Sequence, residues 1–127
     1  MPDPAIFTAA DVEAGSVFNP ESGFHSDVVV TGDHLQLIWA KLEPTGTYAL
    51  HTHTHEQVSL LIQGRMRFTV GDEVRDIGPG DMWYAPAGTP HGGEVLGDEP
   101  VVFIDVYAPP SETIVEQVER CRAQSEA

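Results

Sequence analysis

Three histidines fall within five residues of this 127-residue chain, at positions 51, 53 and 55. In an extended strand alternate side chains point to one face, so His51 and His53 are expected to project together. A fourth histidine, His91, follows a stretch rich in glycine and proline. Neutral imidazoles that converge from separate strands, with an oxygen donor, are typical ligands of a divalent metal ion. The spacing therefore predicts one mononuclear metal site, and Gln57 stands where its amide oxygen could complete it.

The composition argues against several classes of partner. Twenty acidic and six basic residues give a formal net charge of −14 at pH 7. Such a surface repels phosphate backbones and anionic lipid, so we expect neither a nucleic acid nor a membrane as partner. The chain has a single cysteine, Cys121, and no apolar run of membrane-spanning length, and we expect no signal peptide. These features predict a single-domain cytoplasmic protein that acts on a small molecule.

Short β segments between turn signals dominate the middle of the chain. Their number and spacing, without an intervening helix, predict an all-β sandwich or barrel. Gly32-Asp33, between two apolar runs, predicts a hairpin. After Pro109-Pro110 the apolar spacing predicts one helix over about 112–123. The predicted strands cover 28–31, 34–42, 57–62, 65–70, 82–85, 91–95 and 101–107, beside one that carries the clustered histidines.

The same patterns divide the chain into three parts. Residues 1–26 are expected to form an irregular N-terminal arm with at most one short strand. Residues 27–110 form the predicted barrel, and residues 111–127 form the C-terminal helix and tail. The elements that hold the histidines all belong to the middle part.

Two segments resemble the two motifs of the cupin family. The first has His51-x-His53, three residues, Gln57, six residues and Gly64. The second has a glycine, five residues, Pro-x-Gly, two residues and a histidine, here Gly80, Pro86, Gly88 and His91. The resemblance implies a single cupin domain, a conserved β-barrel or jelly roll, with one divalent metal ion (Zn, Ni, Fe or Mn) inside. It also implies His51, His53, Gln57 and His91 as ligands, and a homodimer.

Gln57 departs from the family pattern, in which most metal-binding members have a glutamate. Three histidines and one glutamine are all neutral, so the ligands leave the full charge on a divalent ion. Such an ion is a stronger Lewis acid than one neutralised by a carboxylate. The departure therefore favours chemistry in which the ion polarises a substrate oxygen.

Within that family the chain is most similar to the small KdgF-type proteins, which linearise unsaturated uronates. The shared residues are His55-Glu56-Gln57, Gly78-Pro79-Gly80-Asp81, Tyr84, His91-Gly92 and Asp105-Val106-Tyr107-Ala108-Pro109. This similarity implies a catalytic Asp105 and a substrate pocket that includes Tyr84 and Tyr107. The alternative for Asp105 is a hydrogen-bonding partner of a metal ligand. The family's uronate-binding arginine falls near Ser111, and the segment from Arg75 to Arg120 has no lysine or arginine between its ends.

Three functions follow as hypotheses. The first is a metal-dependent isomerase or lyase for a small oxygenated substrate, sugar-acid-like or carbonyl, in which Asp105 or His55 moves the proton. The second is a non-haem metal dioxygenase of the small cupin type. The third is a non-catalytic, small-molecule-binding cupin. For His55 the alternative to catalysis is a solvent-exposed position in a turn.

Overall fold

The computed structural model describes residues 2–126, which form ten strands and two helices. The helices are α1 (Ala9–Gly15) and α2 (Glu112–Glu126). The strands are β1 (Val17–Asn19), β2 (Phe24–Thr31), β3 (Gln36–Leu42), β4 (Tyr48–His51), β5 (Glu56–Gln63), β6 (Arg65–Val70), β7 (Glu73–Ile77), β8 (Met82–Ala85), β9 (His91–Leu96) and β10 (Val101–Ala108). The all-β class with a short C-terminal helix is as expected.

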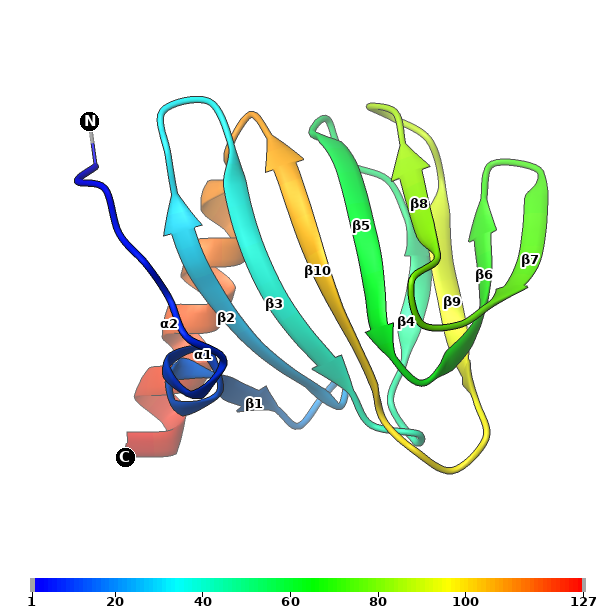
Figure 1. Ribbon diagram of the computed structural model, residues 1–127, viewed down its shortest axis with the longest axis horizontal. Coiled ribbons are helices and arrows are strands. Elements are labelled where there is room, and N and C mark those ends of the chain that lie inside the picture. The colour runs from blue at the N-terminus through cyan, green and yellow to red at the C-terminus, as the bar shows by residue number, and fades with distance from the viewer. Residues whose placement is uncertain (1, 127) are drawn as a thin grey trace.

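The strands form two antiparallel sheets that face each other (Figure 1). The larger sheet has the order β1-β2-β3-β10-β5-β8, and the smaller has the order β4-β9-β6-β7. Strands β2 and β3 form the hairpin predicted at Gly32-Asp33, where the Gly32 N–H donates to the Leu35 carbonyl at 2.7 Å. The clustered histidines and His91 lie on or beside β4 and β9, at the edge of the smaller sheet.

Alternation of side chains along the strands builds the core between the sheets. In β3 the residues Ile38, Ala40 and Leu42 are buried, and the intervening residues are only partly covered. Phe103 of β10 packs among them, and burial of each such side chain contributes about 1.5–3 kcal/mol. This period of two also fixes which residues of β10 face the interior, and Asp105 is one of them.

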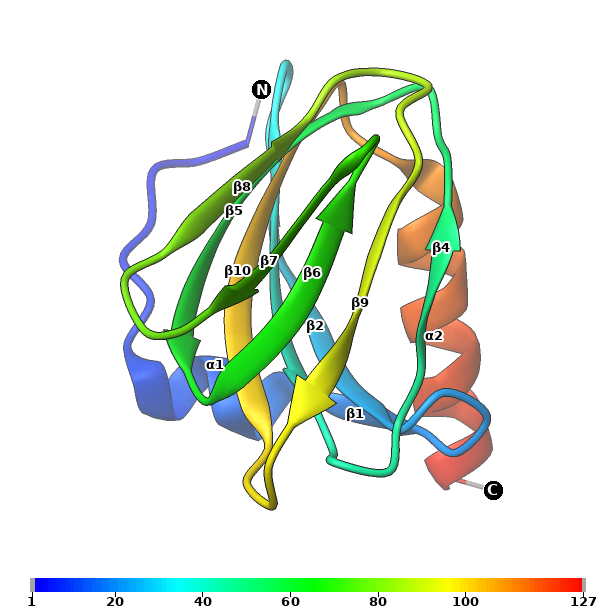
Figure 2. The ribbon, with the colours of Figure 1, turned by 90° about the vertical axis from the view of Figure 1, so that its right-hand side faces the viewer.

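The smaller sheet covers only part of the larger one, and α2 covers much of the rest. Figure 2 shows α2 and the strand β4 of the smaller sheet on the same side of the larger sheet, and Figure 1 shows α2 behind β2. Ser111 caps the helix, because its Oγ accepts the N–H of Ile114 at 3.3 Å. The buried Gln36 fixes this cap, since its Oε1 accepts the Ser111 N–H at 2.9 Å and its Nε2 donates to the Ser111 carbonyl at 3.1 Å. Helix α2 is therefore anchored to β3 at its first residue.

The structure differs from the sequence-based expectation in four places. Helix α1 was not predicted, and strand β2 begins at Phe24, inside the segment 1–26 expected as an irregular arm. Strand β7 was also missed, and α2 extends three residues beyond the expected end at 123.

Neither helix within residues 2–126 has the length and apolar character needed to cross a membrane.

Candidate metal centre

Three histidines meet where β4 and β9 lie side by side. His51 ends β4, His91 begins β9, and the two residues are paired across the strands. Strand β4 ends at His51, so His53 reaches the cluster from the following loop rather than by strand alternation. One ligand atom from each of the three imidazoles lies within 4.8 Å of the others. The structure thus brings together the three histidines predicted as ligands.

A main-chain carbonyl holds each of these imidazoles. Nδ1 of His51 donates to Ala49 at 2.9 Å, and Nδ1 of His91 donates to Thr89 at 3.0 Å. Nδ1 of His53 donates to the carbonyl of His55 at 2.9 Å. Because a carbonyl oxygen can only accept, the proton of each neutral ring is on Nδ1. Each Nε2 is therefore left as a free electron-pair donor, the form that binds a metal ion.

Gln57 directs its amide oxygen at the histidines. Its Nε2 donates to Ser59 Oγ at 2.9 Å and to Asp105 Oδ1 at 3.0 Å, which fixes the orientation of the amide. Its Oε1 then lies 3.0 Å from Nε2 of His53 and 3.1 Å from Nε2 of His91. The fourth predicted ligand is thus in reach of the cluster.

These short contacts join atoms that all accept hydrogen bonds. Two acceptors do not attract each other unless a cation or a proton lies between them. Burial, together with the neighbouring His51 and His53, lowers the pKa of His91, although its bond to the Thr89 carbonyl partly opposes this, so a proton on the ring is disfavoured. Two ligand atoms each about 2.1 Å from an ion, at a bond angle near 90°, lie about 3 Å apart. The residues present therefore fit a divalent metal ion.

Glycines allow the close approach that builds the cluster. A Cβ on Gly92 would lie 2.9 Å from the backbone of Leu50, so only glycine lets β4 approach β9 at this point. Gly88, with a φ of 76°, donates its N–H to the carbonyl of His53 at 2.8 Å. That bond ties the loop before His91 to the loop that carries His53.

Asp105 lies beside the cluster in the interior of the barrel. It is 5% exposed, and its Oδ1 accepts hydrogen bonds from Gln57 and Ser59. Burial raises the pKa of Asp105 to about 7, although the two hydrogen bonds favour the charged form. Within residues 2–126 these hydrogen bonds go to Oδ1, which leaves Oδ2 available to a ligand.

A cavity of about 350 Å³ opens beside the cluster. His51, Asp105 and Tyr107 line it, together with Tyr48 and residues of α2. Tyr107 was predicted as a pocket residue, and it lies on the same side of β10 as Asp105, with its ring centroid 5.2 Å from that of His53. The cavity brings an acid–base group, a phenol and one histidine of the cluster, His51, to one space.

Tyr84 lies away from this cavity, and its role in a substrate pocket stays a prediction. In β8 the buried residues are Trp83 and Ala85, so Tyr84 points to the outer face of the sheet and is 52% exposed. Its hydroxyl donates to Glu56 at 2.6 Å, and it is not part of the lining of the cavity. Its pocket role was inferred from family similarity, whereas strand alternation places its side chain on the outer face.

His55 lies next to the cluster but outside the three-histidine group. Its ring stacks on Tyr107 with a centroid distance of 5.9 Å and an interplanar angle of 20°. Burial and the nearby His53 lower the pKa of His55. Its Nδ1 is buried and has no hydrogen-bond partner among the described residues. The position allows contact with a ligand near Tyr107, and the catalytic role of His55 stays a prediction.

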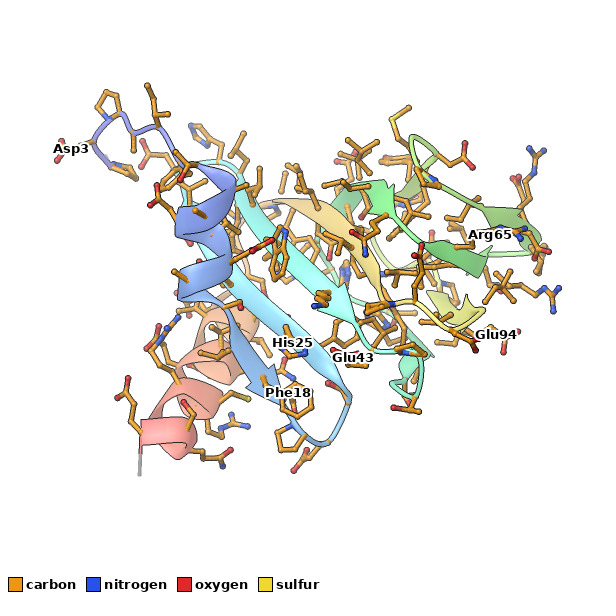
Figure 3. All side chains as sticks on the ribbon, turned by 60° about the horizontal axis from the view of Figure 1, so that its bottom comes forward. Asp3, Phe18, His25, Glu43, Arg65 and Glu94 are labelled. Carbon is orange, nitrogen blue, oxygen red and sulfur yellow. The ribbon has the colours of Figure 1, made fainter. Side chains whose placement is uncertain are left out.

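His25, a histidine of β2 outside the cluster, has a local partner. Figure 3 shows His25 close to Glu43 and Phe18, with Nε2 of His25 2.9 Å from the Glu43 carboxylate. The ring centroids of Phe18 and His25 are 4.7 Å apart. His25 therefore belongs to a surface contact rather than to the metal centre.

Sequence reasoning missed two groups of residues around the centre. Ser59 follows Gln57 by two positions in β5, so strand alternation places a polar residue inward and could have indicated it. Tyr48 is buried beside His51 and His91, with ring centroids 5.6 and 6.5 Å away. Helix α2 gave no such signal, because nothing in its sequence says which wall it covers.

The two sheets and the histidine cluster define a small barrel protein with a metal-binding type of site. The family model for the cupin domain matches residues 38–107, so the chain belongs to the cupin family. This match includes all four predicted ligands, Asp105 and Tyr107. The resemblance to the cupin family and the fold class predicted from the sequence are confirmed.

Several known proteins are similar to this chain. The structure of KdgF from Halomonas sp. superposes with a TM-score of 0.70 and 26% identity over 77% of this chain and 91% of that one. Oxalate decarboxylase OxdC from Bacillus subtilis (strain 168) is 30% identical over 96 residues, which are 68% of this chain and 25% of that protein. H2HPP isomerase from Bacillus subtilis is 29% identical over 87 residues, 68% of this chain and 36% of that protein. The chain thus spans about a quarter to a third of the length of these two enzymes.

Proposed function

We propose that the protein is a metal-dependent enzyme in which His51, His53, His91 and Gln57 hold one divalent transition-metal ion. The observation that carries this proposal is the pair of contacts from Gln57 Oε1 to the Nε2 atoms of His53 and His91, at 3.0 and 3.1 Å. A shared cation accounts for these acceptor–acceptor contacts. Zinc, nickel, iron and manganese all accept imidazole ligands, so the donor set leaves the choice among them open.

The reaction we infer is an isomerisation or a lyase-type cleavage of a small substrate that has a carbonyl or hydroxyl oxygen. When bound, a divalent ion supplies Lewis-acid polarisation of such an oxygen. The four neutral ligands favour this chemistry, because none of them offsets the charge of the ion. The similarity to proteins named as an isomerase, a decarboxylase and KdgF supports an enzyme rather than a binding module.

Asp105 is the group proposed to move the proton. It lines the cavity with His51 and Tyr107, and its pKa of about 7 keeps both protonation states populated near neutral pH. As a carboxylate it takes a proton from the substrate, and as an acid it returns one. An isomerisation then leaves the composition of the substrate unchanged, while in a cleavage the proton goes to the leaving group. Gln57 and Ser59 keep the carboxyl in place through Oδ1.

The test has two parts. Elemental analysis of protein purified without chelator should find about one divalent ion per chain. A content far below one ion per chain would contradict the proposal. A substrate screen should then include 4,5-unsaturated uronates and neutral carbonyl compounds, with product formation followed by NMR. Iron in the site, with oxygen uptake on a screened compound, would replace the isomerase proposal with the dioxygenase alternative.

A further inference from the structure

The cavity beside the metal centre is lined by two kinds of side chain, titratable groups next to the histidines and mostly apolar groups elsewhere. At one end lie His51, Asp105 and Tyr107. The rest of the wall comes mainly from the larger sheet and α2, and its apolar residues include Phe24, Ile38, Phe103, Ile114, Val118 and Cys121. Its polar residues, which include Asn19, Ser22, Ser26, Thr47 and Gln117, are all uncharged. We propose that the site takes a substrate with a neutral, largely apolar body, and that α2 receives this body. The inference rests on the proposed function only in placing the reacting oxygen at the histidine end.

Charge is the first argument. Within residues 2–126 the lining of this cavity contains neither lysine nor arginine. Arg122, which follows the lining residue Cys121, lies 3.5 Å from Asp27 and 3.7 Å from Glu119, so carboxylates engage its guanidinium. Asp105 and the net charge of −14 add negative potential. An anionic group on the body of a substrate would be desolvated here without a partner, which costs binding free energy.

The position of α2 is the second argument. The match to the family ends at residue 107, whereas α2 begins at Glu112, so this wall lies outside the part of the chain that defines the family. The helix is anchored before any ligand arrives, because the side chain of Gln36 makes two hydrogen bonds with Ser111. A preformed apolar wall loses little ordering entropy on binding. Helix α2 is therefore suited to set which body the site accepts, while the barrel supplies the reacting groups.

Volume is the third argument. At about 350 Å³ the cavity is at the low end of the range for ligand sites, which is about 300–1,000 Å³. Its apolar half includes the aromatic rings of Phe24 and Phe103, whose centroids are 6.0 Å apart in an edge-to-face arrangement. Aromatic walls of this kind suit a ring or a short branched chain.

The test compares two probes that share a ketone and differ at the far end of the ring. These are 4-methylacetophenone, which is neutral, and 4-acetylbenzoate, which carries a carboxylate. Titrations followed by protein NMR, on the metal-free and the metal-loaded protein, should give at least about tenfold tighter binding of the neutral probe, with shifts at Ile114 and Cys121. Equal affinity, tighter binding of the anion, or no shift at these residues at millimolar probe would overturn the inference.

A positive charge placed on α2 tests whether the substrate body lies against this helix. Gln117 lines the cavity and is solvent-exposed, so Gln117→Arg is expected to fold. It should strengthen binding of 4-acetylbenzoate by about tenfold or more, because the carboxylate gains a partner. The matched control is Gln124→Arg, the same change about two turns further along α2 and outside the lining, which should leave both affinities unchanged. If folded Gln117→Arg protein fails to bind the anion more tightly, the substrate body does not lie against α2.

Metal analysis separates this inference from the proposed function. Loss of the neutral preference in protein that binds its ion would refute the inference alone. Absence of metal binding, with the probe preference intact in the metal-free protein, would refute the proposed metal centre alone.

Discussion

The amide oxygen of Gln57 lies 3.1 Å from Nε2 of His91, and the amide nitrogen of Gln57 lies 3.0 Å from Oδ1 of Asp105. One side chain therefore faces the histidines with its acceptor and the buried carboxylate with its donor. A glutamate at position 57 would place a second carboxylate oxygen against Asp105, where like charges disfavour ionisation. The amide at this position thus keeps the negative charge on Asp105 rather than on a ligand.

Removing the amide oxygen should weaken metal binding. Gln57→Leu introduces an apolar side chain of similar size without the oxygen, and we expect the dissociation constant for a divalent ion to rise by at least about tenfold. His91→Ala should abolish stoichiometric binding. His34→Ala is the matched control, since His34 is exposed in the β2–β3 loop. Calorimetric titration of the chelator-treated proteins gives the constants, and wild-type affinity in Gln57→Leu would exclude the glutamine as a ligand.

Gly92 should be intolerant of a side chain. Gly92→Ala sets a methyl group 2.9 Å from the backbone of Leu50, which pushes β4 away from β9 and separates His51 from His91. We expect a loss of about 1–3 kcal/mol in the free energy of unfolding, with weaker metal binding. Gly78→Ala is the control, because its new Cβ would meet only the Arg65 side chain at 4.0 Å. Denaturant unfolding measures both, and equal stabilities would contradict the close approach.

Asp105 should be needed for turnover but not for metal. In Asp105→Asn the amide oxygen can still accept from Gln57 and Ser59, so the ligand arrangement is kept. Once a substrate is found, we expect kcat to fall by about 100-fold or more, the usual contribution of an acid–base group. Metal content should stay at the wild-type level. A variant that loses its metal along with activity would point instead to a structural role for the carboxylate.

The two tyrosines of the family similarity should behave differently. Tyr84→Phe removes an exposed hydroxyl that bonds to Glu56, and we expect stability within about 0.5 kcal/mol of wild type and unchanged turnover. Tyr107→Phe removes a hydroxyl inside the cavity and should change kcat or KM. Steady-state kinetics of both variants check this. A defect in Tyr84→Phe alone would bring the outer face of β8 into the reaction.

The homodimer expected from the sequence stays a prediction, and the outer face of β5 and β8 is its best candidate surface. Because each copy has a net charge of −14, two copies associate more readily through a surface with few charged residues. Neighbouring strands β5 and β8 expose an uncharged, apolar row there: Val58, Leu60, Ile62, Met82 and Tyr84. Light scattering after size exclusion should find a dimer for the wild type and a monomer for Leu60→Glu. Val74→Glu, an exposed change on β7, should remain dimeric, and a monomeric wild type would end the proposal.

Local patterns were enough to predict most of the fold. Glycine and proline spacing placed the turns, and apolar alternation placed β3, β5 and β10. Strand β7 was missed because Glu73–Ile77 lies at a sheet edge and is largely exposed, so it carries no buried stripe. Helix α1 has no buried residue, and only Val12 and Gly15 are half-buried, but its start did have a signal, the capping box between Thr8 and Asp11.

The metal centre was more predictable than the cavity. His51, His53, Gln57 and His91 stand at motif spacings that the barrel converts into proximity. The walls depend instead on how α2 docks, and the contact between Gln36 and Ser111 joins residues 75 positions apart. Such a long-range contact leaves no periodic trace in the sequence. For Tyr84, by contrast, a local signal was present, because the alternation of Trp83 and Ala85 in β8 indicates the outer face.

The N–H of Gly88 bonds to the carbonyl of His53, and other carbonyls orient the remaining imidazoles, so the backbone sets the spacing of the ligands before an ion arrives. Chelation should therefore empty the site without unfolding the chain, and exchange of one ion for another should need no refolding. If ions exchange in this way, the ion found in purified protein depends on which metals the host cell supplies as well as on the affinity of the site. Refilling one apoprotein sample with each candidate ion in turn is then the direct way to learn which of them supports turnover.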